Sequence, residues 1–440
     1  MLPMPLTLLL VLASLPLVTL LGLAAARRPT VLLAMYAALV PFGSSIAIPG
    51  VEGSFGTVST LLGLAISAML LLHLLLGRDR ASHIPAALPL WVLVVVSAII
   101  TIGWSIDRVR TLDGLIVLTS LVALYVVASL LDITPEGVHR IGTASVVAGG
   151  LIGLLAIVQL ATGTMNLEPV TEVPRFALAG SGGEPGGDPN ITAAGLLLPL
   201  SIALFRVVER GRTRRSRTLN GLAAASAVAA ILLTGSRGGM LALLAIGLIL
   251  LFADPERRPS GRHVLLGLTA VMVLFALTPA NVQDRLQDSS STGRTDIWAI
   301  GLAACDDYCL HGSGWSTFGL VHARGLLESP DRTGWVFGYG PHNVWLQLLV
   351  EAGVLGLVLF MAALAVNYRD LIRLPSAWRG PPLAALTGLL AANIFIANFD
   401  FKYFWLTLIY VNLAVTAAGH MPTHARSSQD PAFATPAGIA

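Results

Sequence analysis

Long apolar runs, separated by short polar breaks, occupy nearly the whole of the 440-residue chain. A helix needs about 20 apolar residues to cross the roughly 30 Å hydrocarbon core of a bilayer. The pattern therefore predicts about 13 membrane-spanning helices and an all-α, polytopic transmembrane helical bundle. The expected spans lie near residues 5–26, 31–48, 58–76, 86–103, 111–131, 141–161, 191–208, 218–234, 238–253, 264–279, 343–366, 382–398 and 403–419.

Composition agrees with a membrane protein and excludes an ordinary soluble one. Hydrophobic residues make up 55% of the chain and charged residues 12%, whereas soluble domains carry about 25% charged residues. The net charge of +3 is no sign of a nucleic-acid partner, because an arginine excess near lipid headgroups is what membrane topology requires. The bilayer is the expected surrounding.

Arginine residues gather in the loops on one side of the expected bundle, with six of them between residues 206 and 217. Short cytoplasmic loops are enriched in Arg and Lys, so this side is predicted to be the cytoplasm. The chain is accordingly expected to be a multi-pass protein of the cytoplasmic membrane, with its N-terminus outside if every span exists. Residues 5–26 lack a preceding basic region and a cleavage motif, so this span is expected to be retained.

Two segments on the opposite, external side interrupt the membrane pattern. Residues 163–190 are rich in Gly, Pro and acidic residues and are expected to form an irregular loop. Residues 280–342 form a segment too long for a simple connector, and loops of that size usually carry function. Within it, Ile297, Trp298, Gly301 and Leu302 recur at helical spacing after Arg294, which predicts a short amphipathic helix in a lid over the membrane surface.

Arg237 lies in the short break LLTGSRGGMLALL between two apolar runs, where a charge is difficult to place. A guanidinium at a membrane boundary costs several kcal/mol unless it meets an anion or water. Gly235, Gly238 and Gly239 beside it let a ligand and backbone N–H groups approach closely. This residue is therefore a candidate for substrate binding and catalysis.

Arg175 and Arg294 are expected on the same external side as Arg237. Planar guanidinium groups make paired, charge-assisted hydrogen bonds to phosphate oxygens, so three of them suit a diphosphate. The diphosphate expected at this face belongs to a polyprenyl-linked sugar. The alternative is that each Arg extends to the headgroups or pairs with a nearby acid, such as Glu172 or Asp188.

His342, in the segment GYGPHNVWLQLLVEAG, is expected at the external mouth of a span. A neutral imidazole accepts a proton near pH 7, which a sugar hydroxyl needs to lose as it attacks an anomeric carbon. The alternative is a histidine that only caps the helix start. Asn343, Gln347 and Glu351 share one helix face, expected to hold neighbouring spans together, with Glu351 about 180° from His342.

Cys305 and Cys309 are the only cysteines, and both fall in the long external segment. That compartment is oxidising, so a disulfide and two free buried thiols both remain open. With only these two thiols and scattered His residues nearby, the segment is not expected to bind zinc. The sequence predicts neither a metal nor a cofactor.

Four motifs, in this order, together resemble the bacterial O-antigen ligase and polymerase superfamily. They are Arg175 with DPN at 188–190, TGSRGG around Arg237, GRTDIW from Gly293 followed by HGSGWSTFG at 311–319, and PHNVWLQLLVEAG from Pro341. Each motif is weak alone, but their order, spacing and shared side make the combination specific. The motifs cover about residues 163–360, and the pattern of spans extends the resemblance over most of the chain.

The resemblance implies a GT-C-like membrane glycosyltransferase that moves a glycan from undecaprenyl diphosphate to a glycan or lipid acceptor outside the cytoplasmic membrane. Arg237 and Arg294 would bind the donor diphosphate, His342 would serve as base or orient the acceptor hydroxyl, and Arg175 would contribute to substrate binding at a less regular position of the motif. The family is thought to need no metal ion. Departure of a lipid diphosphate builds negative charge, which preorganised guanidinium groups stabilise in the transition state.

The predicted domain organisation follows from the resemblance. Residues 1–162 form N-terminal transmembrane helices, residues 163–419 an O-antigen ligase-like membrane domain with its external loop at 280–342, and residues 420–440 a disordered cytoplasmic tail. The leading expectation is a ligase. A polymerase of the same superfamily is the first alternative, and a transporter or flippase for lipid-linked sugars is the alternative from another class.

Overall fold

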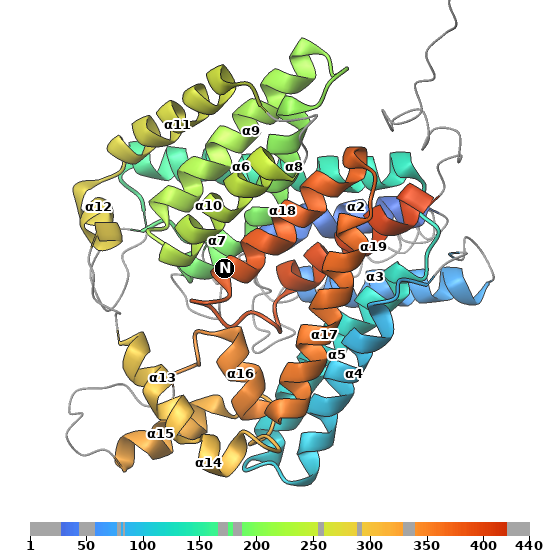
Figure 1. Cartoon of the computed structure of the whole chain (residues 1–440), viewed down its shortest axis with the longest axis vertical. Coiled ribbons are helices and arrows are strands. Elements are labelled where there is room, and N and C mark those ends of the chain that lie inside the picture. The colour runs from blue at the N-terminus through green and yellow to red at the C-terminus, as the bar shows by residue number, and fades with distance from the viewer. Residues whose placement is uncertain are drawn as a thin grey trace, which may run out of the picture.

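The computed structural model of the chain describes residues 28–43, 58–76, 81, 84–165, 175–178, 187–253, 259–287, 293–328 and 339–419. These ranges are mainly helical and contain no strand, so the predicted all-α fold is confirmed. The expected span at 5–26 and the expected tail at 420–440 lie outside the described residues. In chain order (Figure 1) the helices are α2 (Pro29–Leu39), α3 (Val58–Leu75), α4 (Leu88–Ile100), α5 (Arg108–Ser129), α6 (Pro135–Thr162), α7 (Pro189–Gly195), α8 (Leu197–Val208), α9 (Arg214–Leu233), α10 (Arg237–Phe252), α11 (Gly261–Ala276), α12 (Ala280–Gln287), α13 (Arg294–Ala303), α14 (Cys305–Tyr308), α15 (Phe318–Leu327), α16 (Val344–Glu351), α17 (Gly353–Ile372), α18 (Ser376–Ala392) and α19 (Lys402–Gly419).

Several of these helices are suited to cross a membrane. Five segments of the described chain are both long and apolar enough to do so, and five shorter helices are also apolar. The prediction of a multi-pass membrane protein is therefore confirmed. The five long segments are Arg108–Ser129, Pro135–Thr162, Pro189–Val208, Arg214–Leu233 and Gly353–Ile372.

Side-chain caps fix where several of these helices begin. The hydroxyl groups of Thr134 and Thr213 accept hydrogen bonds from the first-turn N–H groups of α6 and α9. Ser236 accepts the N–H of Gly239 in the same way and makes Arg237 the first residue of α10. Such a cap satisfies an otherwise unpaired backbone donor and stabilises a helix by about 1 kcal/mol. The position of Arg237 is thus set by the sequence immediately around it.

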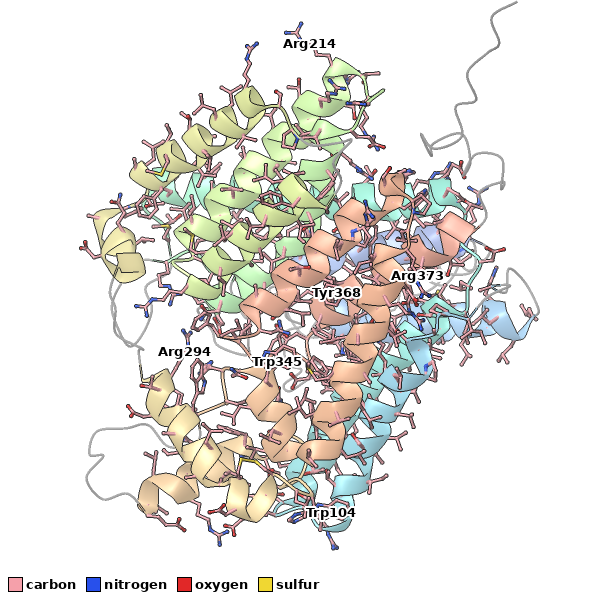
Figure 2. All side chains as sticks on the ribbon, in the orientation of Figure 1. Trp104, Arg214, Arg294, Trp345, Tyr368 and Arg373 are labelled. Carbon is pink, nitrogen blue, oxygen red and sulfur yellow. A yellow bond between two sulfur atoms is a disulfide. The ribbon has the colours of Figure 1, made fainter. Side chains whose placement is uncertain are left out.

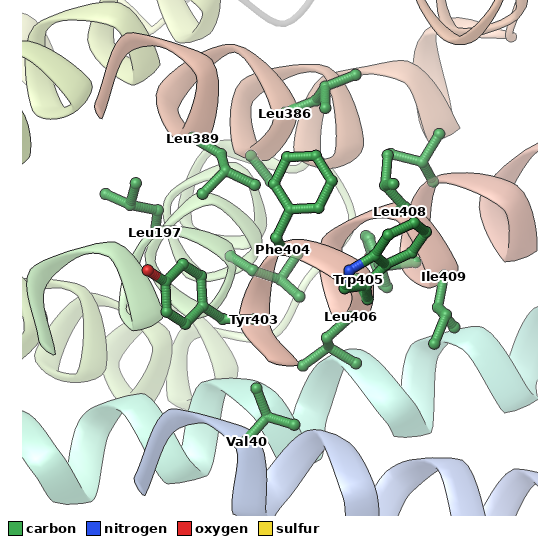
Figure 3. Packing of buried hydrophobic residues seen from close by; sticks show 14 of the residues in the cluster. Val40, Leu197, Leu386, Leu389, Tyr403, Phe404, Trp405, Leu406, Leu408 and Ile409 are labelled. Carbon is green, nitrogen blue, oxygen red and sulfur yellow. The ribbon is translucent and has the colours of Figure 1, made fainter. Parts of the chain in front are cut away.

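An aromatic core holds α19 and the segment before it in the middle of the bundle (Figure 3). The ring of Phe399 lies 5.2 Å from that of Trp405, 5.4 Å from Phe404 and 6.1 Å from Trp91 of α4, centroid to centroid. The indole of Trp405 also donates a hydrogen bond to the carbonyl of Phe399. Aromatic pairs at these separations add about 1 kcal/mol each beyond the area they bury. The connection between α18 and α19 is therefore anchored at Phe399.

Helices α13, α14, α15 and α16 form a separate cluster, here called the short-helix layer, below the larger bundle in Figure 1. Ile297 of α13, Phe318 and Val321 of α15, and Leu346 and Val350 of α16 make its own small hydrophobic core. The predicted helix starting at Arg294 is confirmed. Leu302, expected on its apolar face, is instead exposed.

The single span predicted at 343–366 is wrong, because the chain breaks between α16 and α17 at Gly353. Gly353 has φ of +75°, and an added Cβ would lie 2.8 Å from the carbonyl oxygen of Leu310. The loop before α15 occupies this break, where Ser313 N–H binds the carbonyl of Val350 and Val354 N–H binds that of Cys309. Of these two helices only α17 is long enough to cross the membrane, and α16 belongs to the short-helix layer.

The span predicted at 382–398 also differs from the structure at both ends. Helix α18 begins earlier, at Ser376, and carries Pro381 and Pro382 within its first turns. It ends at Ala392, and residues 393–401 form an irregular connection to α19. Those residues are apolar enough to continue a hydropathy pattern, but here they line the candidate functional site.

Candidate functional site

Three of the predicted site residues lie at the beginnings of helices. Arg237 is the first residue of α10, Arg294 is the first residue of α13, and His342 comes two residues before α16. Figure 2 shows Arg294 at the end of the short-helix layer nearest the larger bundle. The candidate site is therefore at the junction of the membrane helices with the short-helix layer.

Phe395, in the α18–α19 connection, joins Arg294 to the start of α10. The guanidinium carbon of Arg294 lies 5.7 Å from the centre of the Phe395 ring, close enough for a cation–π contact. Trp298, one turn further along α13, has its ring 6.4 Å from that of Phe395. On the other side, Gly238 packs so closely that an added Cβ would lie 3.4 Å from Phe395 Cβ and 3.3 Å from the carbonyl oxygen of Ala392. The glycine after Arg237 thus lets the start of α10 pack directly against the α18–α19 connection.

The backbone around His342 is held by hydrogen bonds to α13 and to the α18–α19 connection. Trp298 Nε1 donates to the carbonyl of Pro341 at 3.1 Å. Asn343 Nδ2 donates to the carbonyl of Ile394 at 3.2 Å, and Val344 N–H donates to that of Asn393. His342 itself has φ of +45°, a value that non-glycine residues rarely adopt. These contacts fix the imidazole beside α13 and the α18–α19 connection.

Burial, together with the charge of Arg294, favours the neutral imidazole of His342. Burial lowers the pKa of His342 below the ordinary value of 6.5, and the positive charge of Arg294 lowers that pKa further. The carboxylate of Asp188 acts in the opposite direction, and His322 adds a smaller lowering effect. Arg294 and Asp188 therefore both lie within electrostatic reach of His342, and near pH 7 the imidazole is free to accept a proton.

Arg175 is the most deeply buried of the predicted site residues, with 2% of its surface exposed. Its Nε donates a 2.6 Å hydrogen bond to the carbonyl of Thr234, three residues before Arg237. Phe176 N–H binds the carbonyl of Leu233, and Leu178 N–H binds the hydroxyl of Thr192 in α7. The described contacts of Arg175 thus support the turn that presents Arg237.

Glu351 and Gln347 belong to the frame beneath the site. Glu351, 2% exposed, accepts a 2.9 Å hydrogen bond from Phe318 N–H at the start of α15 and a 3.2 Å bond from Gln347 Nε2. Glu351 thus joins α16 to α15 of the short-helix layer, whereas the sequence analysis expected this polar face to hold neighbouring membrane spans together. Asn343, the third member of the face, caps α16 by accepting the N–H of Leu346.

Cys305 and Cys309 form a disulfide between successive turns of the short-helix layer. The bridge closes only the few residues between them, so it constrains the rest of that layer little. Among the described residues, no group of three or more His, Cys, Asp or Glu side chains is placed to hold a metal ion. The expectation of a metal-independent site stays a prediction.

The sequence analysis missed the α18–α19 connection, which supplies Phe395 and Asn393 to the site. Asn393 is fully buried, and its side-chain amide has no hydrogen-bond partner within the described residues. The run NIFIANFDF carries a signal that would have helped, because Asn393, Asn398 and Asp400 interrupt an apolar stretch. Polar residues at the end of an expected span are a reason to look for a substrate path.

For the glycosyl transfer that the resemblance implies, replacing Phe395 with Leu is expected to lower the rate about tenfold at subsaturating donor, because the cation–π contact that holds Arg294 is lost. The loss should appear mainly as an increase in the donor KM, measured with purified protein. Phe395→Trp keeps an aromatic ring and should restore the wild-type KM. Phe401→Leu is the matched control, since Phe401 stacks on Tyr403 away from Arg294. Equal effects of the Leu substitutions at both positions would contradict a positioning role for Phe395.

Fold and site together define a class: a multi-pass helical membrane protein with arginines and a neutral histidine at the junction of its membrane helices with a layer of short helices. Comparison with known proteins narrows this class. Residues 222–361, which contain Arg237, Arg294 and His342, match the O-antigen ligase family. The resemblance to the O-antigen ligase and polymerase superfamily, predicted from the motifs, is confirmed.

A curated relative agrees with this result. Over 334 residues the chain is 28% identical to the exopolysaccharide production protein ExoQ of Rhizobium meliloti (strain 1021). The match covers 70% of this chain and 71% of that protein, so it extends well beyond the O-antigen ligase region.

Proposed function

We propose that this protein is a glycosyltransferase that moves a glycan from undecaprenyl diphosphate to a hydroxyl acceptor at the outer face of the cytoplasmic membrane. The observation that carries the proposal is the cation–π contact of Arg294 with Phe395, which also packs on Gly238 beside Arg237. Arg294 also lowers the pKa of His342, so these two residues lie near each other, and Phe395 connects Arg294 to the start of α10. Groups that act on one diphosphate sugar have to lie around it.

The reaction that suits these residues is a displacement at the anomeric carbon. The acceptor oxygen attacks that carbon, and the bond from carbon to the diphosphate oxygen breaks. The electron pair leaves with undecaprenyl diphosphate, whose growing negative charge is stabilised by Arg237 and Arg294. His342 accepts the proton of the acceptor hydroxyl, so atoms and charge balance without a nucleotide.

The acceptor is what separates a ligase from a polymerase. The O-antigen ligase match at 222–361 favours transfer to a lipid or other non-repeating acceptor. The relative named for exopolysaccharide production favours the second candidate, in which the acceptor is another lipid-linked repeat unit. Both use the same donor chemistry and the same proposed roles for Arg237, Arg294 and His342.

Proteoliposomes containing the purified protein and lipid-linked glycans extracted from the producing organism test the proposal. We expect release of undecaprenyl diphosphate, detected by mass spectrometry, together with a glycan joined to acceptor. His342→Ala should slow both about 10²-fold, because general-base catalysis is lost. The control is His311→Ala, since His311 is an exposed histidine of the short-helix layer. Unchanged release in His342→Ala would remove the role assigned to this residue.

The pH dependence of transfer should follow the lowered pKa of His342. A base with a pKa below 6.5 stays neutral, and therefore active, at more acidic pH than an ordinary histidine. The acid limb of the kcat/KM profile, which reports the free enzyme, is expected below pH 6.5. Asp188→Asn removes the charge that raises this pKa but keeps a capping side chain on α7, so the limb should move to still lower pH. A shift toward higher pH would contradict the assignment.

A further inference from the structure

A large cavity lies between α6 and α9, away from the candidate site. Its volume is about 880 Å³, within the range of pockets that hold sizeable ligands. The two helices touch at Gly150 and Gly153, where an added Cβ on Gly153 would lie 2.4 Å from the backbone of Ser226. Leu274 of α11 also lines the cavity.

One end of the cavity is cationic. Arg206, Arg212 and Arg215 line it, and no carboxylate does. Arg212 forms an ion pair with Glu209, which lies outside the lining. The resulting excess of positive charge faces the cavity.

Arg206 is the buried member of this group, with 6% of its surface exposed. Its guanidinium donates to the hydroxyl of Thr143 at 3.0 Å and to the carbonyl of His139 at 2.8 Å. Both acceptors are neutral, and no carboxylate in the described part of the chain lies within ion-pair distance of Arg206. A buried cation without a bonded anion is costly, so this end of the cavity favours an anionic ligand.

The rest of the cavity is mainly apolar. Along α6 it is lined by Val146, Leu151, Leu154 and Ile157, and along α9 by Leu219 and Leu222. From Thr143 to Ile157 the helix rises about 21 Å at 1.5 Å per residue, enough to follow an acyl chain through the roughly 15 Å hydrocarbon depth of one leaflet. Leu154 lines this groove and is 54% exposed.

We propose that this cavity binds an anionic phospholipid of the surrounding bilayer. The phosphate lies between Arg206 and Arg215 at the first turn of α9, where a helix start also favours an anion. One acyl chain lies in the apolar groove between α6 and α9. The positive charge at one end fits the phosphate of such a lipid. The apolar groove is long enough for its acyl chain.

The site is separate from the proposed donor site. Helix α9 begins at Arg214 and ends at Leu233, just before the turn that presents Arg237, so its two ends are about 30 Å apart. In Figure 2, Arg214 lies at the upper edge of the molecule, far from Arg294. The lipid proposal therefore does not depend on the proposed function.

Native mass spectrometry of the detergent-purified full chain tests this proposal, with phosphatidylglycerol and phosphatidylcholine of identical acyl chains as probes. Phosphatidylglycerol is expected to bind more tightly, and Arg215→Gln should weaken it about fivefold, the value of one arginine near a lipid phosphate. Arg210→Gln is the charge control, because Arg210 is exposed and outside the cavity lining. Arg206→Gln should weaken phosphatidylglycerol binding more than Arg215→Gln. This comparison is made only if Arg206→Gln keeps the Tm of the wild type.

Leu154→Trp should fill the groove and lower binding of phosphatidylglycerol without removing any charge. Leu155→Trp is its control, since Leu155 is on the same helix but does not line the cavity. Equal affinity for phosphatidylcholine, or no effect of Arg215→Gln and Leu154→Trp, would overturn the proposal. Displacement of phosphatidylglycerol by an equimolar amount of undecaprenyl phosphate would also overturn it, by assigning the cavity to a polyprenyl lipid.

Discussion

Arg294→Gln is expected to reduce glycan transfer by about 10²–10³-fold, the usual cost of losing one preorganised group that stabilises a developing anion. Arg237→Gln should have a similar effect. The decrease should appear in kcat as well as in kcat/KM, because the negative charge grows as the diphosphate leaves. Initial rates of undecaprenyl diphosphate release in proteoliposomes measure both constants.

Arg324→Gln is the control for this loss, because Arg324 is an exposed arginine of the short-helix layer that binds the hydroxyl of Tyr308. Arg294→Lys should recover only part of the activity, since a lysine cannot make the paired hydrogen bonds of a guanidinium. If both arginines bind one diphosphate, the double Gln variant of Arg237 and Arg294 should lose less activity than the product of the two single fold-decreases. Full additivity would indicate that the two arginines act on different groups.

Glu351→Ala is expected to have the largest effect on stability, lowering the free energy of unfolding by about 3 kcal/mol. The change leaves Phe318 N–H and Gln347 Nε2 without their acceptor in a buried place. Thermal unfolding of the detergent-purified protein measures the loss as a decrease in Tm of several degrees.

Glu351→Gln keeps an oxygen that can accept the Phe318 N–H, so it should cost clearly less than Ala. Glu328→Ala is the exposed control at the other end of α15 and should leave the Tm unchanged. If Glu351→Ala has the same Tm as the wild type, the carboxyl group does not hold α15 to α16.

The bundle could be predicted from sequence because each span is specified locally. A helix that crosses the bilayer needs about 20 apolar residues in succession. Such a run can be recognised in the sequence without knowing which helices pack around it. The place of Arg237 in a break between two helices was also predictable, since Gly and a charged residue interrupt the apolar stretch there. The same holds for His342, where Gly340 and Pro341 mark the end of a loop.

The break at Gly353 and the connection after α18 could not be predicted in this way. Leu346, Leu348 and Val350 are apolar because they pack in the protein core, but hydropathy alone gives them the same value as lipid-facing residues. Whether such a helix continues into the membrane depends on the loop at 309–314, which is distant in sequence and docks by backbone hydrogen bonds. Phe395 was missed for the same reason, because its role exists only through its contact with Arg294.

The position of the site at helix beginnings has a consequence for its electric field. Helices α10, α13 and α16 begin at Arg237, Arg294 and Val344, and the start of a helix carries a partial positive charge of about half an elementary charge. That charge comes from peptide groups, so no side-chain substitution and no change of pH removes it. A variant without either arginine should therefore still attract the diphosphate weakly, and the neutral state of His342 does not leave the region without anion-binding potential.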